Sequence, residues 1–376
     1  MISDGATLIY LDYQASTPVR AEVLEAMQPY FSELFGNPHS DDHAAGWQAG
    51  DAVEAARAQV AERIGCLPAE VIFTSGATES NNLAILGLSR GTNHRRKIVV
   101  SAIEHKSVLA PARELEKLGV EVSIAPVTCS GEIDLVKLAE IVDEATLLVS
   151  TMIVNNEIGT RQPIQEISAI CRASGALLHC DGAQAMSWLP IDVFEMGIDL
   201  LSISGHKFGA PKGIGALYVR NDLRNRLIPL QFGGEQENGL RAGTLPTPLC
   251  VGLGEACSLE ISARDVSKWR QRSDALFQRI ACAFPNAVRL GTGDGHPGNV
   301  CITIPGKDAE ALIANMQPEV AASRGSACTS GTPEPSHVLR AIGLTADECA
   351  ETLRFSTAPE TTIDEIEEVS RRIAAI

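Results

Sequence analysis

The sequence has no long run of positive charge. Its largest basic block is Arg95-Arg96-Lys97, and 47 acidic residues outnumber 31 lysines and arginines, which gives a formal net charge of −16. Direct nucleic-acid binding depends on a basic surface, so we do not expect it here. No apolar run reaches the length of a membrane-spanning helix, so no membrane partner is expected. The first residues lack the basic region and apolar stretch of a secretory signal, which favours a cytoplasmic location.

Paired cysteines and clustered metal ligands are also missing. None of the ten cysteines forms a C-x-x-C pair, which indicates reduced thiols in a cytoplasmic protein. Residues 39–43 (HSDDH) place two histidines and two carboxylates together, but no second ligand cluster follows. We interpret this stretch as a polar loop and expect no metal site.

The chain contains a regular alternation of apolar runs and helical patterns, and its 376 residues can form two domains. Strands are predicted at residues 71–73, 98–100, 120–125, 147–154, 176–179, 200–203 and 216–219, with helices between them. This order predicts an α/β fold with a mostly parallel sheet covered by helices on both faces. After residue 262 the pattern changes. We expect a large domain at 15–262 and a smaller α+β domain formed by 1–14 and 263–376.

The strand predicted at 200–203 runs directly into Ser204, His206 and Lys207, followed by the glycine-rich stretch 208–215 (FGAPKGIG). A lysine at the end of a buried strand is partly desolvated, which favours the neutral, nucleophilic amine. The glycines let a flat ring approach the backbone. Lys207 is therefore a candidate to carry pyridoxal 5′-phosphate (PLP) as a Schiff base. The alternative is a lysine whose amine simply extends into water.

Ligands bind outside the carboxyl ends of strands in an open α/β sheet, and other predicted strands end in usable side chains. The turn at 74–80 (TSGATES) opens a helix, so its N–H groups and the Thr78 hydroxyl suit a phosphate, or merely cap the helix. His105 follows the next strand, as a ring-stacking and proton-transfer group or a structural one. Asn156 can bind the ring hydroxyl or a substrate carboxylate. Asp181 can pair with the pyridine nitrogen, although strand-end aspartates often cap the next helix.

Residues 323–333 (SRGSACTSGTP) are rich in small residues and poor in apolar ones. This composition is typical of an exposed, mobile loop. A structural cysteine normally has apolar neighbours, and Cys328 has none, so it is a candidate nucleophile. Arg354 lies on a strand predicted near residues 352–356, where its planar guanidinium could bind a substrate carboxylate or form a structural ion pair.

Taken together, these segments resemble the NifS/IscS-type cysteine desulfurases, PLP enzymes of fold type I in the class V aminotransferase group. The resemblance covers nearly the whole chain and includes residues 10–13 (YLDY), 35–38 (FGNP), 74–80, 154–159 (VNNEIG), 204–207 (SGHK), 241–246 (RAGTLP), the Cys328 stretch and 354–356 (RFS). Within the family, residues 325–330 (GSACTS) resemble the group with the longer cysteine loop.

The resemblance implies a PLP-dependent reaction on L-cysteine that yields L-alanine and a persulfide on Cys328. Lys207 would bind the cofactor and take the substrate Cα proton, His105 would stack on the ring, and Asp181 would pair with its nitrogen. The ring hydroxyl would contact Gln184. The implied phosphate contacts are Ala77, Thr78, Ser204, His206 and, from the partner subunit of a homodimer, Thr244. Asn156 and Arg354 would bind the substrate carboxylate, and a second protein would accept the sulfur.

Two departures from the family pattern concern the ring and the acceptor. The usual Asp-Ala-Thr-Gln reads Asp181-Gly182-Ala183-Gln184 here, which removes a hydroxyl near the ring. Only 22 residues follow Arg354, whereas housekeeping members have a longer tail for scaffold docking. The acceptor route could therefore be iron–sulfur assembly, tRNA thiolation or DNA phosphorothioation. A selenocysteine lyase, another class V lyase or aminotransferase, or a non-enzymatic scaffold remain alternatives. The Cys328 stretch argues against an aminotransferase, which needs no protein thiol, and the intact set of site residues argues against a scaffold.

Overall fold

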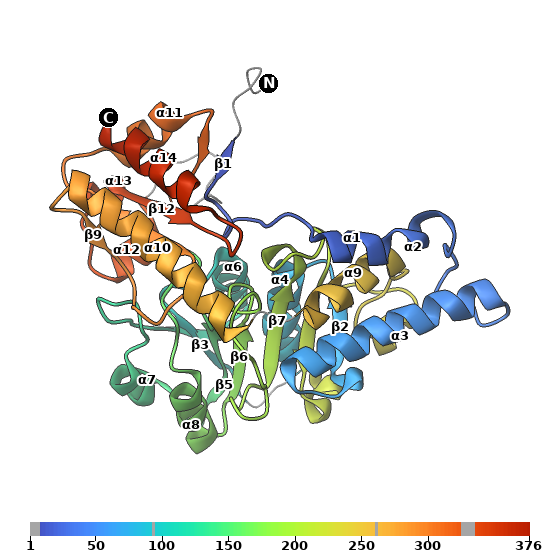
Figure 1. Ribbon diagram of the computed structural model, residues 1–376. Coiled ribbons are helices and arrows are strands. Elements are labelled where there is room, and N and C mark those ends of the chain that lie inside the picture. The colour runs from blue at the N-terminus through green and yellow to red at the C-terminus, as the bar shows by residue number, and fades with distance from the viewer. Residues whose placement is uncertain (1–7, 92–94, 260–261, 325–334) are drawn as a thin grey trace.

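A central sheet of seven strands organises the computed structural model, which describes residues 8–91, 95–259, 262–324 and 335–376 (Figure 1). The strand order is β2-β8-β7-β6-β5-β3-β4. Only β8 runs antiparallel to its neighbours β2 and β7, and the other pairs of adjacent strands are parallel. The strands are β2 (Val71–Thr74), β3 (Lys97–Ser101), β4 (Glu121–Ala125), β5 (Thr146–Met152), β6 (Leu177–Asp181), β7 (Leu200–Ser204) and β8 (Gly215–Val219).

Helices cover both faces of this sheet because its inner strands are apolar on both sides. Val99 and Leu178 join one hydrophobic cluster, whereas Val100 and Leu177, one residue away on the same strands, join the other. This alternation follows from the two-residue period of a strand. The first face is covered by α1 (Ala21–Met27), α3 (Ala44–Ile64), α7 (Leu135–Ile141), α8 (Ile164–Ser174) and α9 (Thr247–Ser258). The second face is covered by α4 (Ala77–Asn82), the π-helical turn η2 (Leu83–Gly87), α5 (Leu88–Arg90) and α6 (Lys106–Lys117).

A second, antiparallel sheet forms from the last third of the chain, in the order β12-β10-β9. Its strands are β9 (Val288–Arg289), β10 (Asn299–Thr303) and β12 (Thr352–Ser356). The helices of this part are α10 (Ala263–Ala283), α11 (Ala309–Met316), α12 (His337–Ala341), α13 (Ala346–Ala350) and α14 (Ile363–Ala374). Strand β1 (Ile9–Tyr10), near the amino terminus, pairs in parallel with β11 (Val320–Ala321), so the first strand of the chain belongs to the part formed by its last third.

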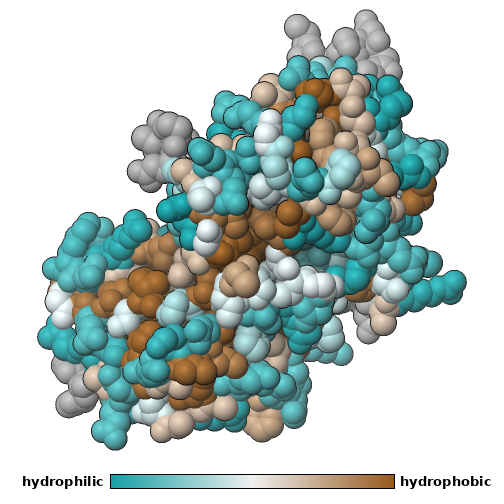
Figure 2. All heavy atoms as spheres, turned by 90° about the vertical axis from the view of Figure 1, so that its left-hand side faces the viewer, coloured by the Kyte–Doolittle hydropathy of each residue, from teal (hydrophilic) through white to brown (hydrophobic). Residues whose placement is uncertain are grey.

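A separate hydrophobic cluster fills the junction between the two sheets. Its buried members are Ile103, Ile158, Cys301, Val338, Leu339 and Ile342. Figure 2 views the molecule from the left-hand side of Figure 1, and hydrophobic residues gather there in a band between its upper and lower parts. The upper part in Figure 1 holds the small sheet and the lower part the large one. The two parts are thus joined by packed side chains, and the domain boundaries at residues 14/15 and 262/263 stay a prediction.

The expected α/β architecture is confirmed, with differences at the ends of elements. The first long helix begins at Ala44, where the His43 ring accepts a hydrogen bond from Gly46 N–H and caps it. His43 therefore has a structural contact in the stretch that we considered for metal binding. Among the described residues, no group of three or more His, Cys, Asp or Glu side chains is placed to hold a metal ion. Within the same ranges, no helix combines the length and apolar composition that crossing a membrane requires.

Candidate active site

A cavity of about 520 Å³ opens at the carboxyl ends of the parallel strands. It is lined by residues that the sequence singles out on six separate segments. These are Ala77, Thr78, His105, Asn156, Asp181, Gln184, Ser204, His206, Lys207 and Arg354. The predicted convergence of strand-end side chains is thus present in the fold.

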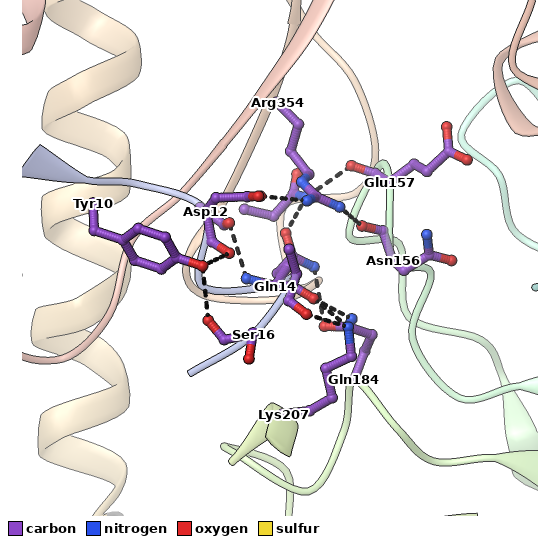
Figure 3. A network of polar contacts seen from close by, with 12 residues as sticks. Tyr10, Asp12, Gln14, Ser16, Asn156, Glu157, Gln184, Lys207 and Arg354 are labelled. Atoms are coloured by element: carbon purple, nitrogen blue, oxygen red, sulfur yellow. Dashed lines mark hydrogen bonds and ion pairs between the residues drawn. The ribbon is translucent and has the colours of Figure 1, made fainter. Parts of the chain in front are cut away.

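Lys207 reaches this cavity from a short 3₁₀ turn, η3 (Gly205–Lys207), directly after β7. Its Nζ donates hydrogen bonds to the main-chain oxygens of Gln14, at 2.7 Å, and Ala15, at 2.9 Å. Figure 3 shows Lys207 and Gln184 pointing toward the same stretch of main chain around Gln14. Both acceptors are neutral main-chain carbonyls.

Asp181 ends the neighbouring strand β6 and is buried at the base of the cavity. Its Oδ2 accepts a hydrogen bond of 2.8 Å from Asn81, and its Oδ1 accepts one of 2.9 Å from Ala183 N–H. On the same strand, His179 is fully buried between the hydroxyls of Ser150 and Ser202. Burial lowers the pKa of His179 to about 4, although the Asp181 charge acts in the opposite direction. The ring beside Asp181 is therefore neutral at pH 7.

His105 precedes α6 and caps it with its own ring. Its Nδ1 accepts a 3.1 Å hydrogen bond from Ser107 N–H and lies 2.8 Å from the Ser107 hydroxyl. Asn81 donates to the same hydroxyl at 2.8 Å, so His105 and Asp181 are connected through Ser107 and Asn81. The ring orientation is thus held by the same polar contacts that orient the carboxylate.

The start of α4 forms another side of the cavity. The first N–H groups of a helix have no intrahelical partner, and Ala77 and Thr78 supply them here. Gly76, just before them, has φ of +143°, a conformation open to glycine. Gly215 of β8 passes so close that a Cβ there would stand 2.6 Å from the Gly76 Cα.

His206 also lines the cavity. Burial and the positive charges of Lys207 and Lys212 lower the pKa of its ring to about 4.

Arg354 lies on β12 of the small sheet and is almost completely buried. Its guanidinium donates to the Asn156 carbonyl and, at 2.6 Å, to the Asp12 carboxylate. Figure 3 shows this cluster, in which Gln14 lies between Arg354 and Gln184. Arg354 Nε has no hydrogen-bond partner among the described residues although it is buried. A buried N–H of this kind is costly unless something accepts its proton.

Two predicted residues are not in this group. Thr244 lies between the 3₁₀ turn η5 (Gln236–Gly239) and α9, is exposed, and is not among the described residues that line the cavity. Its predicted place in a partner's phosphate site stays a prediction. Cys328 lies outside the described residues.

Comparisons with known proteins agree with this arrangement. The sequence matches the class V aminotransferase family over residues 9–369. The chain belongs to this family. A curated relative from Drosophila melanogaster, "Cysteine desulfurase, mitochondrial", is 48% identical over 364 residues, which are 96% of this chain and 78% of the relative. A solved NifS-like protein matches with a TM-score of 0.89 and 30% identity, over 98% of both chains. A structure described as SspA in complex with cysteine matches at 0.83 and 38% identity, over 94% of this chain and 99% of that one.

These matches confirm the expected fold type I architecture, and class V enzymes of this kind use PLP. The cavity fits that cofactor by its chemistry. It offers an amine at Lys207 for the aldehyde, a buried carboxylate at Asp181 for the pyridine nitrogen, and helix N–H groups at Ala77 and Thr78 for the phosphate.

Several polar residues of the candidate site were not predicted from the sequence. Asn81 and Ser107 connect Asp181 to His105, Asp12 holds Arg354, and Gln14 accepts hydrogen bonds from Lys207 and Gln184. Asp12 lies within the stretch 10–13 that carries the family resemblance, which was the one signal that could have indicated it. Asn81 lies inside helix α4, so the expectation that site residues follow the carboxyl ends of strands could not identify it.

Proposed function

We propose that this protein is a PLP-dependent cysteine desulfurase that converts L-cysteine to L-alanine and holds the released sulfur as a persulfide on Cys328. The observation that carries this proposal is the convergence on one cavity of the Lys207 amine, the Asp181 carboxylate and the Arg354 guanidinium, whose Nε has no hydrogen-bond partner among the described residues. The proposal is supported by the 48% identical relative named as a cysteine desulfurase.

Different residues are proposed to bind the aldehyde, the pyridine ring and the phosphate of PLP. Lys207 would bind the aldehyde carbon, and Asp181, oriented by Asn81, would keep the ring nitrogen protonated. His105 would contact the ring and Gln184 its hydroxyl. Ala77, Thr78, Ser204 and His206 would bind the phosphate, together with Thr244 of the partner subunit. When bound, PLP supplies an electron-withdrawing ring that acidifies the substrate Cα proton.

Arg354 and Asn156 are proposed to bind the carboxylate of the substrate. Arg354 Nε is a buried donor without an acceptor, and a substrate carboxylate would provide one. Asp12 and the Asn156 carbonyl accept the other guanidinium N–H groups and so fix its plane. Lys207 would also be the base that takes the substrate Cα proton and returns a proton at the end of the reaction.

Sulfur transfer is assigned to the Cys328 thiolate. Its sulfur attacks the substrate sulfur, so an S–S bond forms while the substrate carbon–sulfur bond breaks. The electron pair of the broken bond stays with the carbon and is protonated, which leaves L-alanine. The balance is one L-cysteine and one protein thiol giving one L-alanine and one protein persulfide. The persulfide then passes its outer sulfur to an acceptor protein.

The test is to treat purified holoenzyme with L-cysteine and to measure alanine together with the mass of each cysteine peptide. The wild type should form alanine and gain one sulfur on the Cys328 peptide. Cys328→Ser should bind PLP and cysteine but form alanine only at background rate. Cys129→Ser is the matched control, because Cys129 is an exposed free thiol outside the cavity. Extra sulfur on another cysteine, or normal turnover by Cys328→Ser, would contradict the mechanism.

A homodimer is the second part of the proposal. Large apolar side chains are exposed near α1, the short helix α2 (Pro29–Ser32) and α3, on the right of Figure 1. They include Leu24, Phe31, Phe35 and Trp47. A contact between two copies would bury them, and two-fold dimers are the commonest oligomers. Sedimentation should give a dimer, and a fully active monomer would contradict this. A cytoplasmic location also belongs to the proposal, supported by the nine described cysteines being free thiols.

A further inference from the structure

The amino-terminal end of α12 contacts two loops of the large sheet at once. Ser336, its N-cap, donates a 2.6 Å hydrogen bond to the buried Glu157 carboxylate. His337, the next residue, donates from Nε2 to the main-chain oxygen of Glu104 at 2.9 Å. The first loop follows β5 and the second follows β3. Two consecutive residues thus bind two separate loops at the rim of the cavity.

Each of these contacts is next in sequence to a residue of the site. Glu157 follows Asn156, whose carbonyl accepts a hydrogen bond from Arg354. Glu104 precedes His105, which lines the cavity beside Asp181. A shift at Glu157 or Glu104 therefore moves the backbone that carries Asn156 or His105.

Apolar packing keeps α12 in this position. Val338, Leu339 and Ile342 are buried against Ile103 and Ile158, one from each loop. Asn155 also joins the loops, because its amide donates to Ile103 O at 3.0 Å while its oxygen accepts from Glu157 N–H at 2.8 Å. The packing and Asn155 hold the loops together, whereas Ser336 and His337 set where each loop stands relative to α12.

We propose that Ser336 and His337 are positioning residues, Ser336 for the substrate-binding side at Asn156 and His337 for the cofactor-binding side at His105. The inference rests on the proposed function for those two roles. The Ser336 hydroxyl donates to Glu157 and also accepts from Leu339 N–H at 3.2 Å, so a single group joins the Glu157 loop to the start of α12. Removing the hydroxyl leaves a buried carboxylate without that donor, which is far more disruptive than losing an exposed bond.

The test compares two variants that should differ in which ligand they affect. Ser336→Ala should weaken cysteine binding about 10-fold, measured by spectral titration of the Cys328→Ser holoenzyme background, with the circular dichroism of bound PLP retained. His337→Phe should reduce that dichroism signal about twofold while cysteine binding changes less than about 3-fold. Ser336→Thr and His337→Gln retain a donor and should restore each property.

Thr345→Ala is the matched control. Thr345 caps the neighbouring short helix α13 by accepting from Glu348 N–H, and it contacts neither rim loop through that cap. The inference is overturned if Ser336→Ala and His337→Phe behave like Thr345→Ala, or if both variants weaken both ligands equally. If Ser336→Ala does not fold, Ser336→Cys, a weaker donor of similar size, should still raise the cysteine dissociation constant and leave the dichroism unchanged. A wild type that binds PLP but forms no alanine would contradict the proposed function instead.

Discussion

Lys207 and Asp181 reach the cavity from neighbouring strands of one sheet, whereas Arg354 reaches it from the last part of the chain and is held there by Asp12, from the first part. We call the first set, with His105 and the start of α4, the floor, and the second set, with Gln14, the wall. The floor depends on the strand order of a single sheet. The wall depends on a hydrogen bond between residues 342 positions apart and on the pairing of β1 with β11. The proposed cofactor contacts thus lie mainly in the floor, and the proposed carboxylate contacts join the two.

Lys207→Ala should have the largest effect and should act on the floor alone. The variant loses both the attachment point and the base, so alanine formation should fall by about 10²- to 10⁴-fold or more. Borohydride should no longer link PLP to the protein, as measured by mass spectrometry of the peptides. Lys212→Ala, at the edge of the same cavity, should retain the link. A reduced adduct on Lys212 in the wild type would contradict the assignment.

Arg354→Lys should affect the wall and leave the floor intact. Lysine keeps the charge but lacks the planar set of N–H groups, so the KM for cysteine should rise roughly 10- to 100-fold, equivalent to one charged hydrogen bond. The absorption band of bound PLP should remain. If PLP is lost together with cysteine binding, floor and wall are not separable.

The stability of the protein should depend on pH through His179, the buried ring on the same strand as Asp181 of the floor. The unfolded protein protonates His179 below about pH 6.5, whereas the folded protein resists this until its lowered pKa near 4. Folding free energy contributed by the neutral ring is therefore fully present above pH 6.5 and is lost as the pH falls to about 4.

The measurement is urea unfolding of the wild type and His179→Asn at pH 7 and pH 4.5. Stability of the wild type should fall by roughly 2–3 kcal/mol more than that of the variant over this interval. Comparing the two proteins separates His179 from His206 and His296, whose pKa values burial also lowers, to about 4 and about 3. Equal losses in both proteins would show that this position is solvated.

Asp12→Asn should give the smallest effect. Asparagine still offers an oxygen to the Arg354 Nη2, but the hydrogen bond loses one of its charges. A neutral acceptor is about half as strong, so KM for cysteine should rise about 5-fold with little change in kcat. If Asp12→Asn raised the KM for cysteine more than Arg354→Lys does, Asp12 would contribute to cysteine binding in some way other than by holding the Arg354 guanidinium.

The same division explains what could be predicted from sequence. Apolar runs ending in Lys207, Asp181 and His105 predict the floor, because parallel strands place their carboxyl ends together. Asp12 and Gln14 lack such a pattern, since their positions depend on packing between distant segments. The antiparallel direction of β8 was equally invisible, because a continuous apolar run does not encode strand direction. The family resemblance, and not periodicity, supplied the individual roles of Gln184 and Thr244.

The pairing of the amino-terminal strand β1 with β11 also implies an order of assembly during translation. Residues of the large sheet, including Lys207, leave the ribosome before Arg354, by roughly 10–30 s at the usual rate of synthesis. Until β12 and β11 arrive, β1 has no partner strand and Asp12 no guanidinium to bind. In a nascent chain the proposed cofactor residues Lys207 and Asp181 are therefore synthesised well before the proposed substrate-binding residue Arg354, so under the proposed function PLP could be bound before cysteine.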